Sequence, residues 1–172
     1  MAKREKLDVF DFAIQGEKNG MDFYMKAAKK FEDRDLKDLF VKLAKEEAAH
    51  LQTFMEFKSK AEGKGIDPAL RNPEIDDYLE SIVQEGLFPR SETVNKRLEK
   101  VETVAQAAAI AMAAEKNAIL LYSELAKLSK DKDQKKFFEK ITKEEKSHIV
   151  MVRNLRADHD PAYAALAFGK FF

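Results

Sequence analysis

The pattern Glu-x-x-His occurs twice in the chain, at Glu47–His50 and at Glu145–His148. Residues three apart on a helix share one face, so each pattern would present a carboxylate beside an imidazole. Each pattern follows a lone glutamate by 30 residues. Carboxylates and imidazoles in this combination are ligands for iron, manganese or zinc. The candidate metal ligands are therefore Glu17, Glu47, His50, Glu115, Glu145 and His148.

The two ligand sets belong to an internal repeat with an offset of 98 residues. Without gaps, residues 13–50 and 111–148 share 16 identities in 38 pairs. A repeat of this kind indicates one supersecondary unit used twice. Because the polar residues are kept in both copies, we expect two equivalent half-sites related by a two-fold axis.

The apolar periodicity predicts an all-α chain with four long helices. Asp33 or Asp35 is expected to cap the second helix, and Asp131 precedes the fourth. The first helix is expected at about 9–30, and the second follows a turn at 31–34 and ends at about 61. The third starts somewhere in 91–98 and ends at about 129, and the fourth runs from just after residue 131 to about 156.

The segments outside these helices have distinct compositions. Residues 66–97 hold three of the four prolines and are expected to form a crossover connector with one short helix. Such a connector can travel the whole length of a long helix, so the third helix would start at the end where the second began. Residues 157–172 form a C-terminal tail, expected to be a short docked helix or a subunit contact. The prediction is one domain over 1–172, a four-helix bundle with one long crossover between helices 2 and 3.

The bundle would bring the four glutamates and two histidines into one layer of its core. No lysine or arginine lies on the inward stripes, and unpaired buried carboxylates are costly or stay protonated. Two divalent cations would balance four carboxylates. We therefore expect two iron ions per chain, with manganese or zinc as alternatives, and Glu47 and Glu145 as the bridging ligands.

Several other polar residues repeat without an obvious ligand role. Tyr24 and Tyr122 are either buried core aromatics or second-shell donors that orient a carboxylate. Glu46 and Glu144 lie about 100° around the helix from the ligands and are expected to be solvated helix charges. His159 is expected in a loop after the last helix.

The composition excludes several classes of function. The 31 basic and 31 acidic residues are well mixed, which argues against nucleic-acid binding. The absence of cysteine excludes disulfides, thiol catalysis and thiolate-bound iron–sulfur centres within this chain. We find no run of about 18 apolar residues and no apolar signal region, so we expect a cytoplasmic protein without a membrane span.

On its six ligands, in this order on four helices, the chain resembles the rubrerythrin branch of the ferritin-like superfamily. The resemblance covers about residues 9–156. It implies a ferritin-like bundle with a di-iron centre that reduces hydrogen peroxide, or at which dioxygen or peroxide oxidises Fe²⁺. It also implies a homodimer or larger homo-oligomer.

The chain departs from rubrerythrins in two respects. It has no cysteine and hence no four-cysteine rubredoxin site, so a peroxidase would need a separate electron-donor protein or Fe²⁺ itself. Met112 stands where rubrerythrins have a further glutamate, which makes the six-ligand set closer to the ferroxidase centre of bacterioferritins. The alternatives are therefore a ferroxidase or iron-storage protein and, from another class, a structural bundle with an inert metal. A monooxygenase or a manganese catalase ranks lower.

Overall fold

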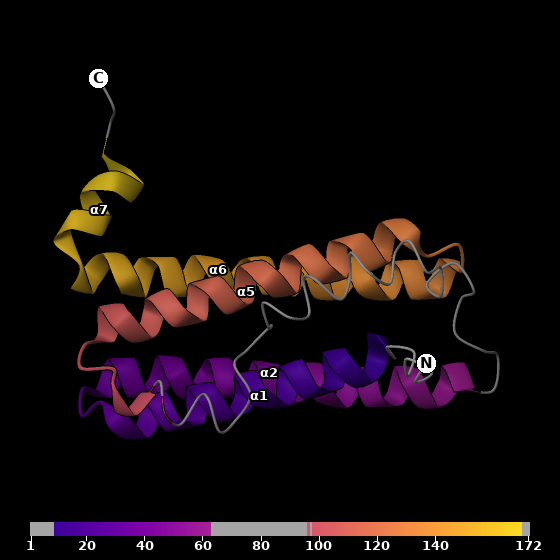
Figure 1. The fold of residues 1–172 in the computed structure, drawn as a ribbon, viewed down its shortest axis with the longest axis horizontal. Coiled ribbons are helices and arrows are strands. Elements are labelled where there is room, and N and C mark those ends of the chain that lie inside the picture. The colour runs from indigo at the N-terminus through magenta and orange to yellow at the C-terminus, as the bar shows by residue number, and fades with distance from the viewer. Residues whose placement is uncertain (1–8, 63–95, 97, 170–172) are drawn as a thin grey trace, which may run out of the picture.

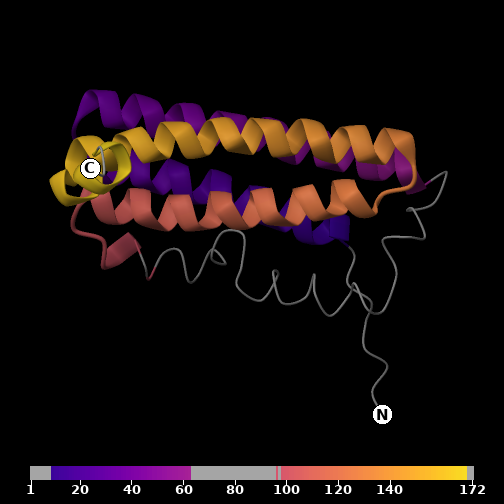
Figure 2. The same cartoon turned by 90° about the horizontal axis from the view of Figure 1, so that it is seen from above.

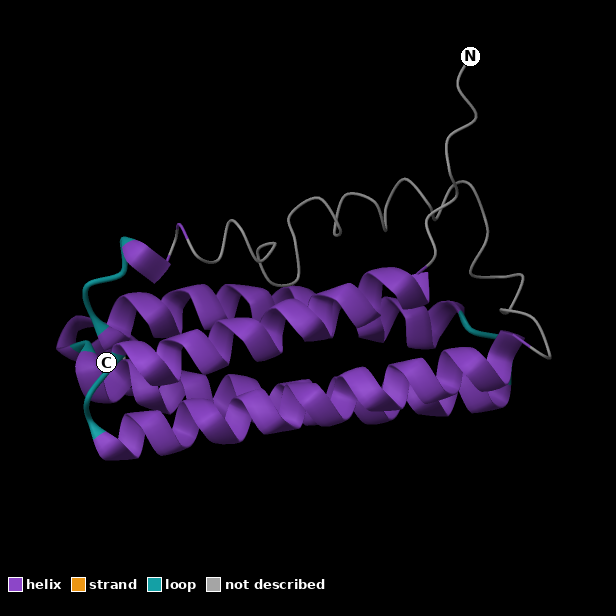
Figure 3. Cartoon of the chain, turned by 90° about the horizontal axis from the view of Figure 1, so that it is seen from below, coloured by secondary structure: helices purple, strands orange, loops and turns teal. Residues whose placement is uncertain are grey.

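The computed structural model describes residues 9–62, 96 and 98–169, and all regular structure within them is helical (Figures 1 and 3). This confirms the all-α prediction. The main helices are α1 (Val9–Lys30), α2 (Arg34–Glu62), α5 (Val104–Leu128), α6 (Lys132–His159) and α7 (Pro161–Phe168).

The bundle consists of two helical hairpins. α1 packs against α2, and α5 packs against α6 (Figure 1). Seen from above, the four long helices run side by side along one axis (Figure 2). Each hairpin contains one copy of the sequence repeat, which confirms the predicted four-helix bundle with internal two-fold symmetry. The connector expected at 66–97 lies outside the described residues except for residue 96.

Side chains just before α2, α5 and α6 cap the first turns of these helices. Asp33 accepts a hydrogen bond from the backbone N–H of Leu36 at 3.0 Å. Asp131 accepts from two backbone N–H groups at the start of α6, both at 2.9 Å. Thr103 and Gln106 form a reciprocal capping box at the start of α5. Each cap satisfies donors that the first helical turn leaves without intrahelical partners.

Two predicted helix boundaries were wrong. The third long helix begins at Val104 rather than within 91–98, because the Thr103 capping box starts a new helix there. The fourth extends to His159 rather than to about Arg156, so His159 ends a helix instead of lying in a loop. Asp160 follows as the cap of both α6 and α7.

The core has two apolar clusters, one toward each end of the bundle. The first includes Tyr24, Phe40, Ala111 and Val152, and the second includes Phe10, Phe54, Tyr122 and Phe138. Along each long helix, one of the glutamates or Glu-x-x-His pairs lies between residues of the two clusters. The polar layer is therefore held between two apolar layers, as the inward stripes predicted.

The short helix α7 follows α6 at one end of the bundle and turns away from the bundle axis (Figure 1). The guanidinium of Arg156 lies 4.1 Å from the centre of the Tyr163 ring, a cation–π contact. The Tyr163 hydroxyl lies 3.5 Å from the sulfur of Met112. These contacts agree with the short docked helix expected in the tail. A role of this helix in subunit contact stays a prediction.

Among the described helices, α5 alone is long and apolar enough, by length and composition, to cross a membrane. This qualifies the expectation from the sequence that no segment could do so. Core helices pass the same test, and α5 carries the fully buried Glu115 and packs along α6. Its apolar character is accounted for by its place in the core.

Phe40 and Phe138 are equivalent in the repeat, and both are fully buried. Replacing either by alanine should lower the free energy of unfolding by about 3–5 kcal/mol, because each leaves a cavity in one apolar cluster. Chemical denaturation of Phe40→Ala and Phe138→Ala measures this loss. Phe168→Ala, at a position 54% exposed, is the control and should change stability little. A loss below about 1 kcal/mol at either core site would contradict this assignment.

Candidate metal centre

All six predicted ligands lie in the central layer, and none is more than 5% exposed. α1 and α5 contribute one glutamate each, and α2 and α6 contribute one Glu-x-x-His pair each. Four of the residues offer ligand atoms that all lie within 4.8 Å of one another: Glu47, His50, Glu145 and His148. The other two glutamates flank this group.

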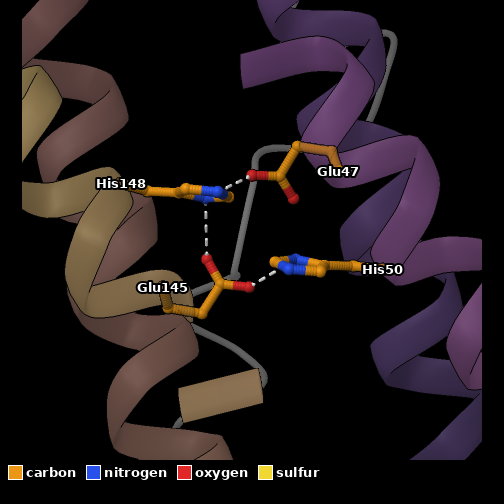
Figure 4. Close-up of side chains that lie close together, drawn as sticks. All are labelled: Glu47, His50, Glu145 and His148. Carbon is orange, nitrogen blue, oxygen red and sulfur yellow. Dashed lines mark ion pairs between the residues drawn. The ribbon is translucent and has the colours of Figure 1, made fainter. Parts of the chain in front are cut away.

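Glu145 reaches both histidines (Figure 4). Its Oε1 lies 2.9 Å from Nδ1 of His50, and its Oε2 lies 3.1 Å from Nδ1 of His148. A carboxylate with one oxygen directed to each half of a site has the placement of a bridging ligand. Glu47 places its Oε1 3.0 Å from Nδ1 of His148 and enters the layer from the opposite hairpin.

The lone glutamates complete two equivalent half-sites. Glu17 Oε2 lies 3.4 Å from Nδ1 of His50, and Glu115 Oε2 lies 3.6 Å from Nδ1 of His148. The two imidazole rings are stacked, with centroids 5.3 Å apart. Each half-site thus combines one histidine, one lone glutamate and an oxygen of Glu145.

The potential metal-ligand atoms at the centre of the layer have no hydrogen-bond partner among the described residues. One buried carboxylate oxygen of each ligand glutamate and Nδ1 of both histidines have no hydrogen-bond partner among the described residues, although several lie within 3.6 Å of one another. Buried polar atoms are costly unless they are paired or bind a metal. Lone pairs that converge in this way fit metal ions shared between the two half-sites.

The remaining oxygens of the two lone glutamates are held across the bundle. The Tyr24 hydroxyl donates a hydrogen bond to Glu115 Oε1, and the Tyr122 hydroxyl donates to Glu17 Oε1. Burial raises the pKa of both tyrosines well above 10, and the nearby carboxylates add to this effect. Both hydroxyls therefore stay protonated and can donate. Their role as second-shell groups of a metal-loaded site stays a prediction.

Burial and neighbouring charges shift the pKa values of several of these buried groups. Burial raises the pKa of Glu115 to about 8, although His148 opposes the shift. Burial also raises the pKa of Glu47, and the charge of Glu145 adds to it. For His50, burial acts to lower the pKa, but the carboxylates of Glu145 and Glu17 outweigh it and raise the pKa to about 10. Metal ions bind deprotonated carboxylates and neutral imidazoles, so loading would release these protons.

Glu46 and Glu144 are partly solvated helix charges, as expected from the sequence, but they also contact the ligand histidines, which the sequence analysis did not predict. Glu46 Oε2 lies 3.0 Å from Nε2 of His148, and Glu144 Oε2 lies 3.2 Å from Nε2 of His50. Each side chain is only 38–39% exposed. A carboxylate at Nε2 can fix the orientation of an imidazole and leave Nδ1 available to a metal ion. Their exact repetition at the 98-residue offset was the signal that could have identified them.

Removing one of these carboxylates should weaken metal binding without removing a ligand. For Glu46→Ala we expect metal affinity to fall by about 10–100-fold, as is typical when a partner of a ligating histidine is lost. Glu46→Gln should retain most of the affinity, because its amide oxygen still accepts from Nε2–H. Isothermal titration calorimetry with Mn²⁺ or Zn²⁺ measures the change in metal affinity.

The matched control is Lys42→Ala, because Lys42 forms a helix-surface ion pair with Glu46 at 3.9 Å and does not contact the histidine. It should bind metal like the wild type. Equal losses in Lys42→Ala and Glu46→Ala would show that Glu46 acts only through surface charge.

Comparison with protein-family models matches residues 8–156 to the family described as Rubrerythrin. No match was found among curated proteins or among solved structures. The matched segment includes α1, α2 and α5, most of α6, and all six residues of the polar layer. The chain therefore belongs to the rubrerythrin family, and its buried glutamate–histidine layer is a site of the di-iron carboxylate type.

Proposed function

We propose that the protein is a non-haem di-iron oxidoreductase that reduces hydrogen peroxide or dioxygen. The observation that supports this most directly is the placement of Glu145, with one oxygen toward each histidine Nδ1. A ligand shared between two equivalent half-sites suits a pair of metal ions, and a pair can deliver two electrons to one O–O bond. When bound, two ferrous ions would supply the two electrons that convert peroxide and two protons to two waters.

Iron is the proposed metal, with manganese or zinc able to bind the same donors. His50 and Glu17 would hold one ion, and His148 and Glu115 the other. Glu145 would bridge the two ions, as its two oxygens already face both half-sites. Glu47 is the second proposed bridge.

The protein residues around the ligands would orient them and exclude water. The two tyrosines hold one oxygen of each lone glutamate, which leaves the other oxygen directed at the histidines. The apolar clusters on both sides of the layer would limit the access of water along the bundle, which would strengthen electrostatic interactions within the site. Electrons would come from a separate donor protein, and we also propose a homodimer or larger assembly.

A ferroxidase or iron-handling function is the second candidate, and Met112 favours it. Met112 lies one turn before Glu115, is 7% exposed, and lies 3.5 Å from the Tyr163 hydroxyl. A thioether is at most a weak ligand for ferric iron. The half-site of Glu115 and His148 therefore lacks the additional carboxylate that a glutamate at position 112 would supply. A ferroxidase needs only the six ligands and releases ferric iron as its product.

Glu115→Ala should reduce the number of tightly bound metal ions from two to one per chain, because its half-site keeps only His148 and shared carboxylates. Native mass spectrometry after loading with Fe²⁺ or Mn²⁺ measures this number. Glu139→Ala, at an exposed position of α6, is the control and should bind two ions. A Glu115→Ala protein that still binds two ions tightly would show that Glu115 is not a ligand.

The oxidant is tested by loading the protein anaerobically with two Fe²⁺ per chain and mixing it in a stopped-flow instrument with hydrogen peroxide or dioxygen. We expect ferric absorption to develop faster with peroxide. Faster oxidation by dioxygen, followed by uptake of further iron, would instead favour the ferroxidase. No change in absorption with either oxidant would favour a structural bundle with an inert metal.

A further inference from the structure

Met112 connects the surroundings of the polar layer to the C-terminal helix. It lies one helical turn before Glu115 on α5, and it belongs to the apolar cluster that also contains Tyr24. Its sulfur accepts a hydrogen bond from the Tyr163 hydroxyl of α7 at 3.5 Å. The equivalent residue in the first copy of the repeat is Ile14, which has no sulfur, so this type of contact is specific to the second copy. A chemical change at Met112 would therefore act both beside the metal centre and at α7.

The contacts that hold α7 against the bundle are weak. None of its residues is buried. Two guanidinium groups of α6 lie over its aromatic rings, Arg156 at 4.1 Å from the centre of the Tyr163 ring and Arg153 at 4.9 Å from that of Phe168. A helix of eight residues is too short to be stable by itself in water, so α7 depends on such contacts. Displacement of the Tyr163 ring should therefore loosen the whole helix.

A thioether can reduce hydrogen peroxide by two electrons. The O–O bond breaks, one oxygen forms a bond to sulfur, and the other leaves as water with both protons. Methionine oxidation by peroxide from solution follows exposure. Such peroxide should attack Met55, which is 55% exposed, and Met25, which is 39% exposed, before it attacks Met112, which is 7% exposed. Peroxide that has entered the polar layer would instead find the Met112 sulfur in the adjoining cluster.

We propose that Met112 is a modification site, oxidised to the sulfoxide by peroxide that enters the metal centre when no reduced metal remains, and that the sulfoxide releases α7. The inference rests on the proposed function, because that function brings peroxide into the layer. Ferrous ions, when bound, would supply the two electrons for each peroxide. After they are oxidised, the Met112 thioether is a two-electron reductant one helical turn from Glu115.

The sulfoxide is incompatible with the present contacts of Met112. It converts a flexible apolar side chain into a polar one inside an apolar cluster. An oxygen that points into the cluster would lack a hydrogen-bond partner, which is costly. An oxygen that points toward α7 would occupy the space now taken by the Tyr163 hydroxyl and would move the ring away from Arg156. The change would be reversible, since methionine sulfoxide can be reduced enzymatically.

The test uses the full chain loaded anaerobically with two Fe²⁺ per chain, oxidised with peroxide, and then given further peroxide without a reductant. Peptide mass spectrometry measures the oxidation of each methionine, and hydrogen exchange of residues 161–168 measures the opening of α7. Met112→Leu keeps an apolar side chain of similar volume and cannot be oxidised. Met55→Leu is the matched control, and circular dichroism shows whether both variants keep their helices.

In the iron-loaded protein, Met112 should be oxidised at least about tenfold faster than Met55, whereas in the metal-free protein Met55 should react first, because exposure then governs the rate. After peroxide treatment, α7 should exchange faster in the wild type and in Met55→Leu. In Met112→Leu its exchange should stay as it was before treatment.

The proposal is overturned if Met112 in the iron-loaded protein reacts no faster than Met55. It is also overturned if peroxide opens α7 equally in Met112→Leu and in the wild type. Ferric absorption distinguishes these results from a failure of the proposed function. If peroxide oxidises the ferrous protein but Met112 stays intact, only the modification site is wrong. If peroxide does not oxidise the ferrous protein at all, the proposed function fails and the modification site fails with it.

Discussion

The structure depends on keeping four carboxylates and two imidazoles in one buried layer. Ionised groups this deep are strongly destabilising unless each finds a partner. The outward-facing atoms have partners, because tyrosine hydroxyls hold the lone glutamates and half-exposed glutamates face the histidine Nε2 atoms. The inward-facing atoms lie close to one another and have no hydrogen-bond partner among the described residues. Protein groups thus hold the outward-facing atoms of the layer, its centre is suited to cations, and an apolar cluster lies on either side of it along the bundle.

The two-fold repeat explains why these partners come from opposite hairpins. Tyr24 on α1 holds Glu115 on α5, and Glu46 on α2 contacts His148 on α6, and the repeat supplies the reciprocal pair in each case. A single hairpin would leave its tyrosine and glutamates without these contacts. The polar layer therefore couples the two hairpins, even though the close helix packing is within each hairpin. These contacts can form only when the two copies of the repeat lie at the same level along the bundle.

The helices and the six ligands could be predicted because both are periodic signals: apolar residues recur along each face, and Glu17 and Glu47 recur at one offset. Helix ends depend on single hydrogen bonds, so the capping box at Thr103 moved a boundary that periodicity left open. Glu46 was missed for a different reason. Its angle on α2 suggested solvent, but its partner is on another helix, and position around one helix does not show what the facing helix presents.

The two sides of the polar layer differ, and the difference bears on its chemistry. On the side of α1 and α5, the glutamates are fully or almost fully buried and tied to tyrosines that are themselves fully buried. On the side of α2 and α6, the histidines contact half-exposed glutamates. Both histidines also line a surface groove between these two helices that is lined by four lysines. The two sides of this symmetric site therefore differ in how close they lie to the protein surface. Because both histidines line the groove between α2 and α6, this side brings ligand side chains to the protein surface, whereas the tyrosines hold the glutamates inside the core on the other side.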